Sequence, residues 1–215
     1  MKFKKKIKTR WHQKRLKDNF FSEAKKLGYR SRSAFKLIEI NKKFRILKKG
    51  QNALDLGAAP GGWSQVLLKN IFSEKNKNII VSVDSKEFKP IKNIKIIKKN
   101  IFDKDFILLL KNYFLNGLDV LVSDAAPSTS GNKFVDHIKS IELSKKSFEI
   151  ALKLLNKGGI LVIKVFDGKK TKELSDLIKK RFLDFNFYKP KSSKSESKEI
   201  YIVAKFLKLK KNLEP

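Results

Sequence analysis

The stretch Leu54-Asp-Leu-Gly-Ala-Ala-Pro-Gly-Gly-Trp63 decides the fold. A short apolar run enters a turn that contains Gly57, Gly61 and Gly62, and a second run of helical character follows from Trp63 to Ile71. Glycine lets the backbone approach a ligand closely, and the first N–H groups of a helix favour negatively polarised ligand groups. This stretch therefore predicts a strand, a cofactor-binding turn and a helix.

Outward from this turn, apolar runs of strand length alternate with longer runs of helical periodicity. The expected strands are Ala53–Leu56, Ile79–Asp84, Ile94–Ile97, Asp119–Ser123, Ile160–Phe166, Phe185–Tyr188 and Ile200–Phe206. The expected helices cover residues 20–26, 31–43, 63–71, 105–114, 135–156 and 171–182, with Gly158-Gly159 as the stop of the fifth. Such alternation predicts an α/β fold with a doubly wound, mostly parallel seven-stranded sheet.

The glycine turn matches neither common nucleotide fingerprint. It lacks the Gly-Lys-Ser/Thr ending of a Walker loop and the spacing of the G-x-G-x-x-G dinucleotide motif. Asp84, however, ends the next expected strand, where a carboxylate at the carboxyl edge of a parallel sheet can accept hydrogen bonds from ribose hydroxyls. The pair of features indicates a nucleotide-like cofactor, whereas a structural turn with a capping aspartate is the alternative. The missing dinucleotide spacing argues against a dehydrogenase.

Composition indicates one globular domain. The chain has 215 residues, 41% of them hydrophobic, which is enough to bury a substantial core. We expect a basic arm over residues 1–30, the folded domain over 31–209 and a short tail over 210–215. With no cysteine and two histidines, we expect neither a disulfide, nor a thiolate zinc site, nor any other metal site. No apolar run is long enough for a membrane span, so we expect a cytoplasmic protein.

The net charge of +30 predicts a polyanionic partner such as RNA or DNA. Codon drift in an A/T-rich genome is the alternative for part of this excess, because lysine greatly outnumbers arginine. Drift does not easily explain the local skew, since residues 1–17 carry nine Lys and Arg and no acid. Trp11 and His12 in this arm could stack on bases.

Four ionisable residues stand in or beside apolar runs, where charge is costly: Lys36, Asp124, Lys164 and Glu199. Lys164 is the clearest case, since it interrupts Gly159-Ile-Leu-Val-Ile-Lys-Val-Phe166, which otherwise has the pattern of a fully buried strand. A buried ammonium costs several kcal/mol unless it is paired. A lysine held there beside a cofactor turn favours a group-transfer enzyme, whereas a structural salt bridge is the alternative for each of the four.

Five collinear segments resemble those of the FtsJ (RlmE-like) family. They are Arg30-Ser-Arg-Ser-Ala-Phe-Lys-Leu37, Asp55-Leu-Gly-Ala-Ala-Pro-Gly-Gly-Trp-Ser64, Ser123-Asp-Ala-Ala-Pro-x-x-Ser-Gly131, Val162-Ile-Lys-Val-Phe166 and Ser197-Lys-Glu-Ile-Tyr-Ile-Val203. The resemblance spans nearly the whole chain. It implies a Rossmann-like class I methyltransferase that uses S-adenosyl-L-methionine to methylate ribose 2′-hydroxyls of RNA. The compact size is most similar to members that act on a uridine of large-subunit ribosomal RNA, so rRNA or the large ribosomal subunit is the expected partner.

By the same resemblance, Lys36, Asp124, Lys164 and Glu199 correspond to a catalytic tetrad. The implied cofactor contacts are Gly61, Trp63, Asp84, Asn100 and Asp124. Asn100 stands where the family usually has an aspartate near the adenine, so the chain departs from the family pattern there; Asp103 is a weaker substitute. Trp63 has a core aromatic residue as its alternative, and His137 is given no role.

A ribose hydroxyl is a poor nucleophile, so the expected work of the enzyme is alignment and removal of one proton. Lys164 is either the proton acceptor or a group that positions the hydroxyl. Asp124-Ala-Ala-Pro127 replaces the Asn/Asp-Pro-Pro-aromatic motif typical of base N-methyltransferases and disfavours that class. The remaining alternative is an RNA-binding protein that has kept a methyltransferase fold without turnover.

Overall fold

The computed structural model describes residues 19–128, 130–194 and 196–208. Seven strands form one sheet in the order β3-β2-β1-β4-β5-β7-β6. They are β1 (Ala53–Leu56), β2 (Ile80–Asp84), β3 (Lys95–Lys98), β4 (Leu118–Ser123), β5 (Leu155–Phe166), β6 (Phe182–Tyr188) and β7 (Glu199–Leu207). The pairings of β1 to β5 are parallel, and β7 runs antiparallel to both β5 and β6. The expected doubly wound, mostly parallel sheet is confirmed.

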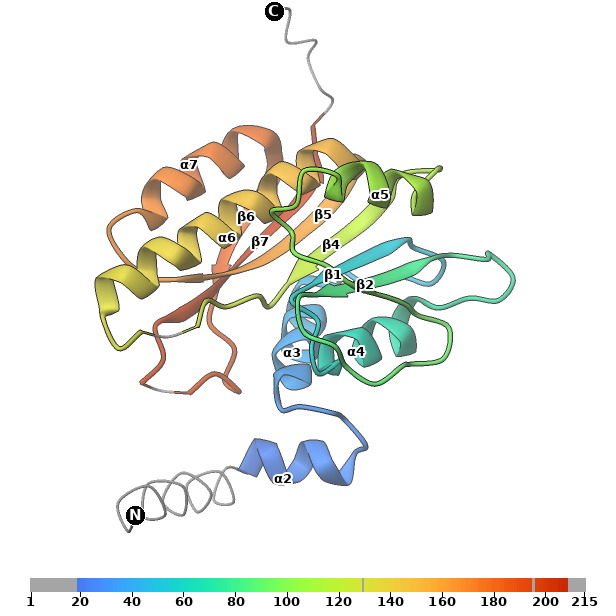
Figure 1. Cartoon of the computed structure of the whole chain (residues 1–215), viewed down its shortest axis with the longest axis horizontal. Coiled ribbons are helices and arrows are strands. Elements are labelled where there is room, and N and C mark those ends of the chain that lie inside the picture. The colour runs from blue at the N-terminus through green and yellow to red at the C-terminus, as the bar shows by residue number, and fades with distance from the viewer. Residues whose placement is uncertain (1–18, 129, 195, 209–215) are drawn as a thin grey trace, which may run out of the picture.

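Helices cover both faces of this sheet (Figure 1). The helices are α2 (Asn19–Lys26), α3 (Ser33–Phe44), α4 (Gly62–Ile71), α5 (Phe106–Tyr113), α6 (Lys133–Leu154) and α7 (Thr171–Arg181). On one face α3 and α4 bury Leu37, Ile40 and Leu67 in one apolar cluster. On the other face α5, α6 and α7 form the larger cluster, which includes Phe106 and Leu174.

The carboxyl ends of β1, β2, β4 and β5 meet at one edge of the sheet, as parallel pairing requires. β7 begins at that same edge because it runs the opposite way, so Glu199 pairs in register with Phe166 at the end of β5. Glu199, the first residue of β7, therefore lies at the edge of the sheet where β4 and β5 end. Ligands of open α/β sheets bind at this edge.

Several predicted boundaries are wrong: β6 begins at Phe182, three residues before the expected Phe185, and the largest difference is where the long helix passes into β5. The long helix was expected to reach Asn156 and to stop at Gly158-Gly159, but α6 ends at Leu154 and both glycines lie inside β5. Gly158 has φ +79°, and the pairing of β5 with β4 shifts register between Leu118 and Val120. The glycines therefore accommodate an irregularity of a strand and do not cap the helix.

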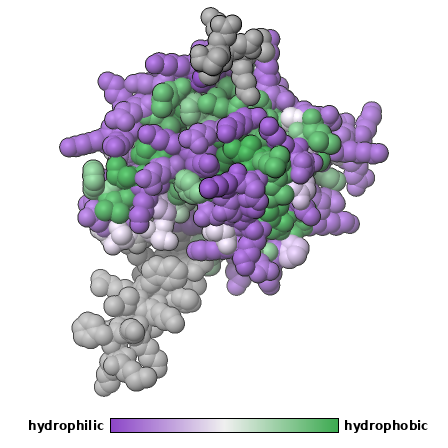
Figure 2. Space-filling model, turned by 45° about the horizontal axis from the view of Figure 1, so that its top comes forward, coloured by the Kyte–Doolittle hydropathy of each residue, from purple (hydrophilic) through white to green (hydrophobic). Residues whose placement is uncertain are grey.

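Two further observations bear on partners. Hydrophilic side chains predominate on the face seen in Figure 2, and hydrophobic ones form separate patches between them. Among the helices that the structure describes, none is long and apolar enough to cross a bilayer. Residues 1–18 of the basic arm expected over residues 1–30, with Trp11 and His12, lie outside the described residues, as does the whole tail over 210–215.

Candidate active site

Lys164 and Asp124 form the first of two ion pairs at the carboxyl edge of the sheet. Lys164 lies near the end of β5 and Asp124 follows the last residue of β4. The Lys164 Nζ lies 3.0 Å from Asp124 Oδ1 and donates to the Asp124 carbonyl oxygen at 2.6 Å. The Lys164 side chain is only 7% exposed. Its burial is thus compensated by two acceptors from a single neighbouring residue.

Lys36 and Glu199 form the second ion pair. Lys36 lies on α3 and Glu199 opens β7, so the pair joins a helix before the sheet to its last strand. The Lys36 Nζ lies 2.6 Å from Glu199 Oε1, and both side chains are 11% exposed. The four residues that the sequence singled out therefore come together as two lysine–carboxylate pairs, both nearly buried.

Tyr201 connects the two pairs. Its hydroxyl donates to Asp124 Oδ1 at 2.6 Å, and the Lys36 Nζ lies 5.9 Å from the centroid of its ring. Tyr201 is also the register partner of Lys164 across β5 and β7. Sequence reasoning missed this residue. The signal exists only once the antiparallel pairing is known, because a tyrosine opposite a buried lysine then brings its hydroxyl to the same carboxylate.

The electrostatics of this cluster favour a charged Asp124 and a neutral Tyr201. Burial would raise the pKa of Asp124, but Lys164, Lys36 and the Tyr201 hydroxyl outweigh it and lower this pKa below its usual range. Burial, together with the negative charges of Asp124 and Glu199, raises the pKa of Tyr201 well above its ordinary value. Tyr201 therefore remains a hydrogen-bond donor to an ionised Asp124 at every pH near neutrality.

Trp63 packs against Tyr201 of this cluster. Its indole N–H donates to the Ser33 carbonyl at 2.8 Å, and its ring lies 5.7 Å from the ring of Tyr201. Trp63 is 2% exposed. Trp63 thus packs between α3 and β7. Its contact with the Tyr201 ring helps to hold the Tyr201 hydroxyl in position.

The glycine turn between β1 and α4 packs against its neighbours so closely that side chains have no room. A Cβ on Gly57, whose φ is +72°, would lie 2.6 Å from the Cα of Ala125, and one on Gly61 would lie 3.2 Å from the Arg30 side chain. Asp84 fastens the same turn, since its Oδ2 accepts from the Ala59 N–H at 2.9 Å. The turn is therefore held against both β2 and the segment after β4.

A cavity of about 330 Å³ opens beside this turn. We call it the cofactor cavity. It is lined by Gly57, Ala59, Asp84, Ser85, Lys86, Lys99, Asn100, Ile101, Asp124, Ala125, Ala126, Ser128 and Leu143. Its volume lies within the range of about 300–1,000 Å³ that is usual for small-molecule sites. Three of the five predicted cofactor contacts, Asp84, Asn100 and Asp124, line it; Gly61 and Trp63 lie behind it.

Asn100 presents a partly used side chain to this cavity. Its Oδ1 accepts from the Phe102 N–H at 3.0 Å, which holds the amide plane. The amide can still offer its N–H donors, so the residue keeps a hydrogen-bonding edge without a charge. Asp103, the substitute considered from the sequence, is exposed and does not line the cavity.

A buried polar chain lies behind the turn. Asp55 on β1 is fully buried, and its Oδ2 accepts from the Ser64 hydroxyl at 2.7 Å, which in turn accepts from Ser82 at 2.9 Å. The other oxygen, Oδ1, is buried with no hydrogen-bond partner. Burial raises the pKa of Asp55 to about 7, with a smaller opposing effect from Ser64. The folded protein thus shifts the pKa of the Asp55 carboxyl close to neutral pH.

The comparison with known protein families settles what this arrangement belongs to. The family model described as FtsJ-like methyltransferase matches residues 29–207. The chain belongs to the FtsJ-like methyltransferase family. The matched range contains both ion pairs and the cofactor cavity, so the family resemblance inferred from the sequence is confirmed.

Two relatives of this FtsJ-like methyltransferase carry the same name. A protein of Rickettsia bellii called "Ribosomal RNA large subunit methyltransferase E" is 41% identical over 91% of this chain and 87% of its own length. A protein of the same name from Anaplasma phagocytophilum is 42% identical over 91% of this chain and 79% of its own length.

A solved structure agrees with the sequence relatives. The crystal structure of a Plasmodium falciparum protein described as a ribosomal RNA methyltransferase has a TM-score of 0.74 and 35% identity, covering 83% of this chain and 98% of that one. A Streptococcus mutans methyltransferase solved in complex with SAH has a TM-score of 0.51 at 16% identity and shares the fold.

Proposed function

We propose that this methyltransferase transfers a methyl group from S-adenosylmethionine to a ribose 2′-hydroxyl of large-subunit ribosomal RNA, at a uridine. The observation that carries the proposal is the pairing of Lys164 with Asp124 beside the cofactor cavity, with Lys36 and Glu199 completing the cluster. The names of the relatives support the rRNA substrate, and the net charge of +30 supports a polyanion. A cytoplasmic location goes with that substrate.

The residues of the cofactor cavity suit an adenosyl amino acid. Asp84 can accept from ribose hydroxyls with the lone pairs that its two backbone contacts leave. Asn100 can face the adenine edge, and Asp124 can face the amino-acid part. Gly61 and Trp63 would act indirectly, by holding the turn and the aromatic layer behind the cavity. S-adenosylmethionine would supply an electrophilic methyl group on its sulfonium sulfur.

The protein's own part is to orient the hydroxyl and to move one proton. Lys164 has three N–H groups in its charged form, and Asp124 engages two of them. In that form the third N–H can hydrogen-bond the hydroxyl oxygen. In the neutral form Nζ carries a lone pair in its place, and this lone pair can accept the hydroxyl proton. Asp124 remains ionised and limits the net charge, while Lys36 and Glu199 hold the neighbouring wall.

The test is to map 2′-O-methyl marks across cellular RNA with and without the gene. We expect one mark in large-subunit rRNA to disappear, to return with the wild-type gene, and to stay absent with a Lys164→Ala gene. A wild-type protein that binds RNA and restores no mark would instead be a binding protein on a methyltransferase fold. A mark that appears on a base nitrogen would also contradict the proposal.

A further inference from the structure

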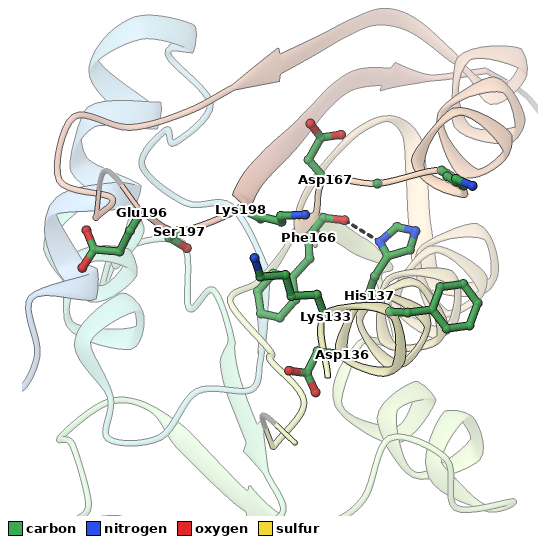
Figure 3. A pocket seen from close by; sticks show the side chains of 11 residues that line it. Lys133, Asp136, His137, Phe166, Asp167, Glu196, Ser197 and Lys198 are labelled. Carbon is green, nitrogen blue, oxygen red and sulfur yellow. Dashed lines mark hydrogen bonds between the residues drawn. The ribbon is translucent and has the colours of Figure 1, made fainter. Parts of the chain in front are cut away.

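A second cavity of about 460 Å³ lies at the same edge of the sheet and is unused by the chemistry described above. We call it the α6–β5 cavity. It is lined by Lys133, Phe134, Asp136, His137, Phe166, Asp167, Gly168, Lys169, Glu196, Ser197 and Lys198. Figure 3 shows that these side chains come from the first turns of α6, the end of β5 and the segment before β7, with Glu196 set apart from the group around Phe166 and His137. It shares no lining residue with the cofactor cavity.

The tetrad adjoins both cavities. Asp124 lines the cofactor cavity, and its partner Lys164 lies two residues before Phe166, which lines the α6–β5 cavity. Phe166 is the register partner of Glu199, and the Asp167 N–H donates to the Lys198 carbonyl at 2.8 Å. A ribose at Lys164 would therefore lie close to both the methyl donor's site and the α6–β5 cavity.

Aromatic side chains form part of the wall of this cavity. Phe134, on the first turn of α6, is 66% exposed, so the face of its ring is accessible to a ligand. His137 is nearly buried, and both of its ring nitrogens are used by the protein: Nδ1 contacts the Phe166 carbonyl at 2.9 Å, and Nε2 accepts from the Lys170 N–H at 3.1 Å. Because the Lys170 N–H can only donate, the proton of the neutral ring is on Nδ1. His137 is thus a fixed wall of the cavity.

Three lysines and three carboxylates line the cavity, and the lysines are the groups that could contact phosphates. Within the part of the chain that the structure describes, no ion pair involves Lys133, Lys169 or Lys198. Two of the three carboxylates, by contrast, are engaged. Ser130 donates to Asp136 Oδ1 through its N–H at 2.7 Å and its hydroxyl at 2.8 Å. Glu196 acts on Arg32, whose guanidinium it attracts.

We propose that the α6–β5 cavity receives one unstacked base of the RNA strand on which the tetrad acts. This inference rests on the proposed function and adds a site to it. A base stacks on an aromatic face without regard to its identity, while lysines at the rim contact the flanking phosphates. The cavity thereby holds the strand so that one ribose lies at Lys164.

The kinetic test uses large ribosomal subunits and purified rRNA from cells that lack the gene. We expect Phe134→Ala to raise KM roughly tenfold, within the range expected for losing one base–aromatic stack, and to leave kcat nearly unchanged. Phe134→Tyr keeps the ring and should stay within about twofold of wild type in KM, on the same reasoning. Phe187→Ala is the matched control, since Phe187 is 45% exposed on β6, away from the cavity lining.

Ultraviolet crosslinking of the same RNA to the protein, read by mass spectrometry, identifies the ligand. Crosslinked nucleotides on the peptide that contains Phe134 or Phe166 support the proposal. Crosslinks found only on other peptides overturn it, as does a Phe134→Ala variant whose KM matches that of the Phe187→Ala control. If the wild-type protein methylates neither substrate, the proposed function fails, and the crosslinking result still decides the RNA contact of the cavity.

Discussion

Lys164 contacts two oxygen atoms of Asp124. Substitution of Lys164 removes both contacts, so its effect depends on which partners Asp124 keeps. Removing the side chain leaves Asp124 with the Tyr201 hydroxyl and the nearby Lys36 charge, so the carboxylate does not become an unpaired buried charge. We therefore expect Lys164→Ala to fold and to bind S-adenosylmethionine, with turnover lower by roughly 10² or more. Methyl transfer from labelled cofactor to rRNA measures this.

Two further variants interpret that loss. Lys205→Ala is the control, because Lys205 is also a strand lysine in an ion pair, 2.8 Å from Asp184, but far from the tetrad. Lys164→Arg keeps the charge and cannot accept a proton near neutral pH. Near-wild-type turnover of the Arg variant would identify Lys164 as a positioning group, and a loss similar to that of Lys164→Ala would support a proton acceptor.

Tyr201→Phe isolates a single hydrogen bond. The variant keeps the ring contact with Trp63 and loses the donor to Asp124 Oδ1. A hydrogen bond to a charged group is worth about 1.5–3 kcal/mol, so we expect kcat to fall tenfold or more with KM little changed. An unchanged kcat would show that the hydroxyl serves packing alone.

The same variant shifts a pH dependence. The pKa of Asp124 is lowered in the folded protein, so its ion pairing stabilises the fold above the ordinary aspartate pKa and is lost as pH falls through the lowered value. Without the Tyr201 donor this pKa rises toward the ordinary value, so the loss of stability on acidification should be smaller and should end at higher pH, while its onset, which the unfolded chain sets, stays the same. Urea unfolding between pH 3 and 7 measures the shift.

At the scale of single residues, the sequence predicts which charged side chains need a partner better than how those side chains are arranged. Lys164 and Asp124 stand out because charge in an apolar run requires a partner, and the structure provides one. Glu199 lies among serines and lysines and gains its meaning only from the register that sets it beside Phe166. The division into two pairs, and the role of Tyr201 between them, depend on that long-range pairing and have no local signal.

Among the elements, the β1–α4 turn offers a matched comparison of two glycines. Gly57→Ala adds a Cβ 2.6 Å from the Ala125 Cα at φ +72°, whereas Gly28→Ala adds one at φ +75° with nothing within 4 Å. Both pay the left-handed backbone cost of about 1 kcal/mol. Gly57→Ala must also displace the segment after Asp124, so it alone should weaken S-adenosylmethionine binding in calorimetry. Equal losses in both variants would contradict the close-approach argument.

The raised pKa of Asp55, on β1, makes the stability of the fold depend on pH. Its folded pKa of about 7 lies above the ordinary aspartate value, so the protonated carboxyl stabilises the fold below about pH 4, and this contribution fades as pH rises toward 7. The three-unit difference corresponds to roughly 4 kcal/mol. Asp55→Asn should remove most of this dependence and gain stability relative to wild type as pH rises, by urea unfolding at pH 5 and pH 8.

The control for that measurement is Glu74→Gln, which neutralises an exposed carboxylate in the segment between α4 and β2. It should follow the wild-type pH dependence. If Asp55→Asn also follows the wild-type curve, Asp55 is ionised in the folded protein at neutral pH, and a water molecule or another group must satisfy its Oδ1.

Periodicity predicts the elements well and their ends less well. Ala53–Leu56 and the start of α7 at Thr171 match the structure, because sharp glycine or polar boundaries flank them. The end of α6 does not, since Gly158-Gly159 resembles a helix stop and instead lies in a strand that continues from Leu155. A helix that passes into a strand without a loop gives no local boundary signal.

At the scale of the whole molecule, part of the net charge of +30 is concentrated in residues 1–17, so its role in RNA binding can be tested by deletion. Deleting residues 1–17 removes nine cations, so fewer counterions are released on RNA binding. We expect weaker RNA binding and a shallower slope of log K against log salt concentration, with S-adenosylmethionine affinity unchanged. Filter binding at several salt concentrations measures this, and an unaltered slope would assign the arm's charge to codon drift.

The position of β7 has a consequence for synthesis. β5 and β6 are joined through α7 along the chain, yet in the sheet β7 lies between them, and β7 is made last. A nascent chain that has emerged only as far as Tyr188 has no strand on which β6 can pair, and it lacks Glu199 and Tyr201. We therefore expect the enzyme to be inert until β7 has been synthesised, and a message truncated before codon 199 to yield a protein that has a cofactor cavity and lacks both Glu199 and Tyr201.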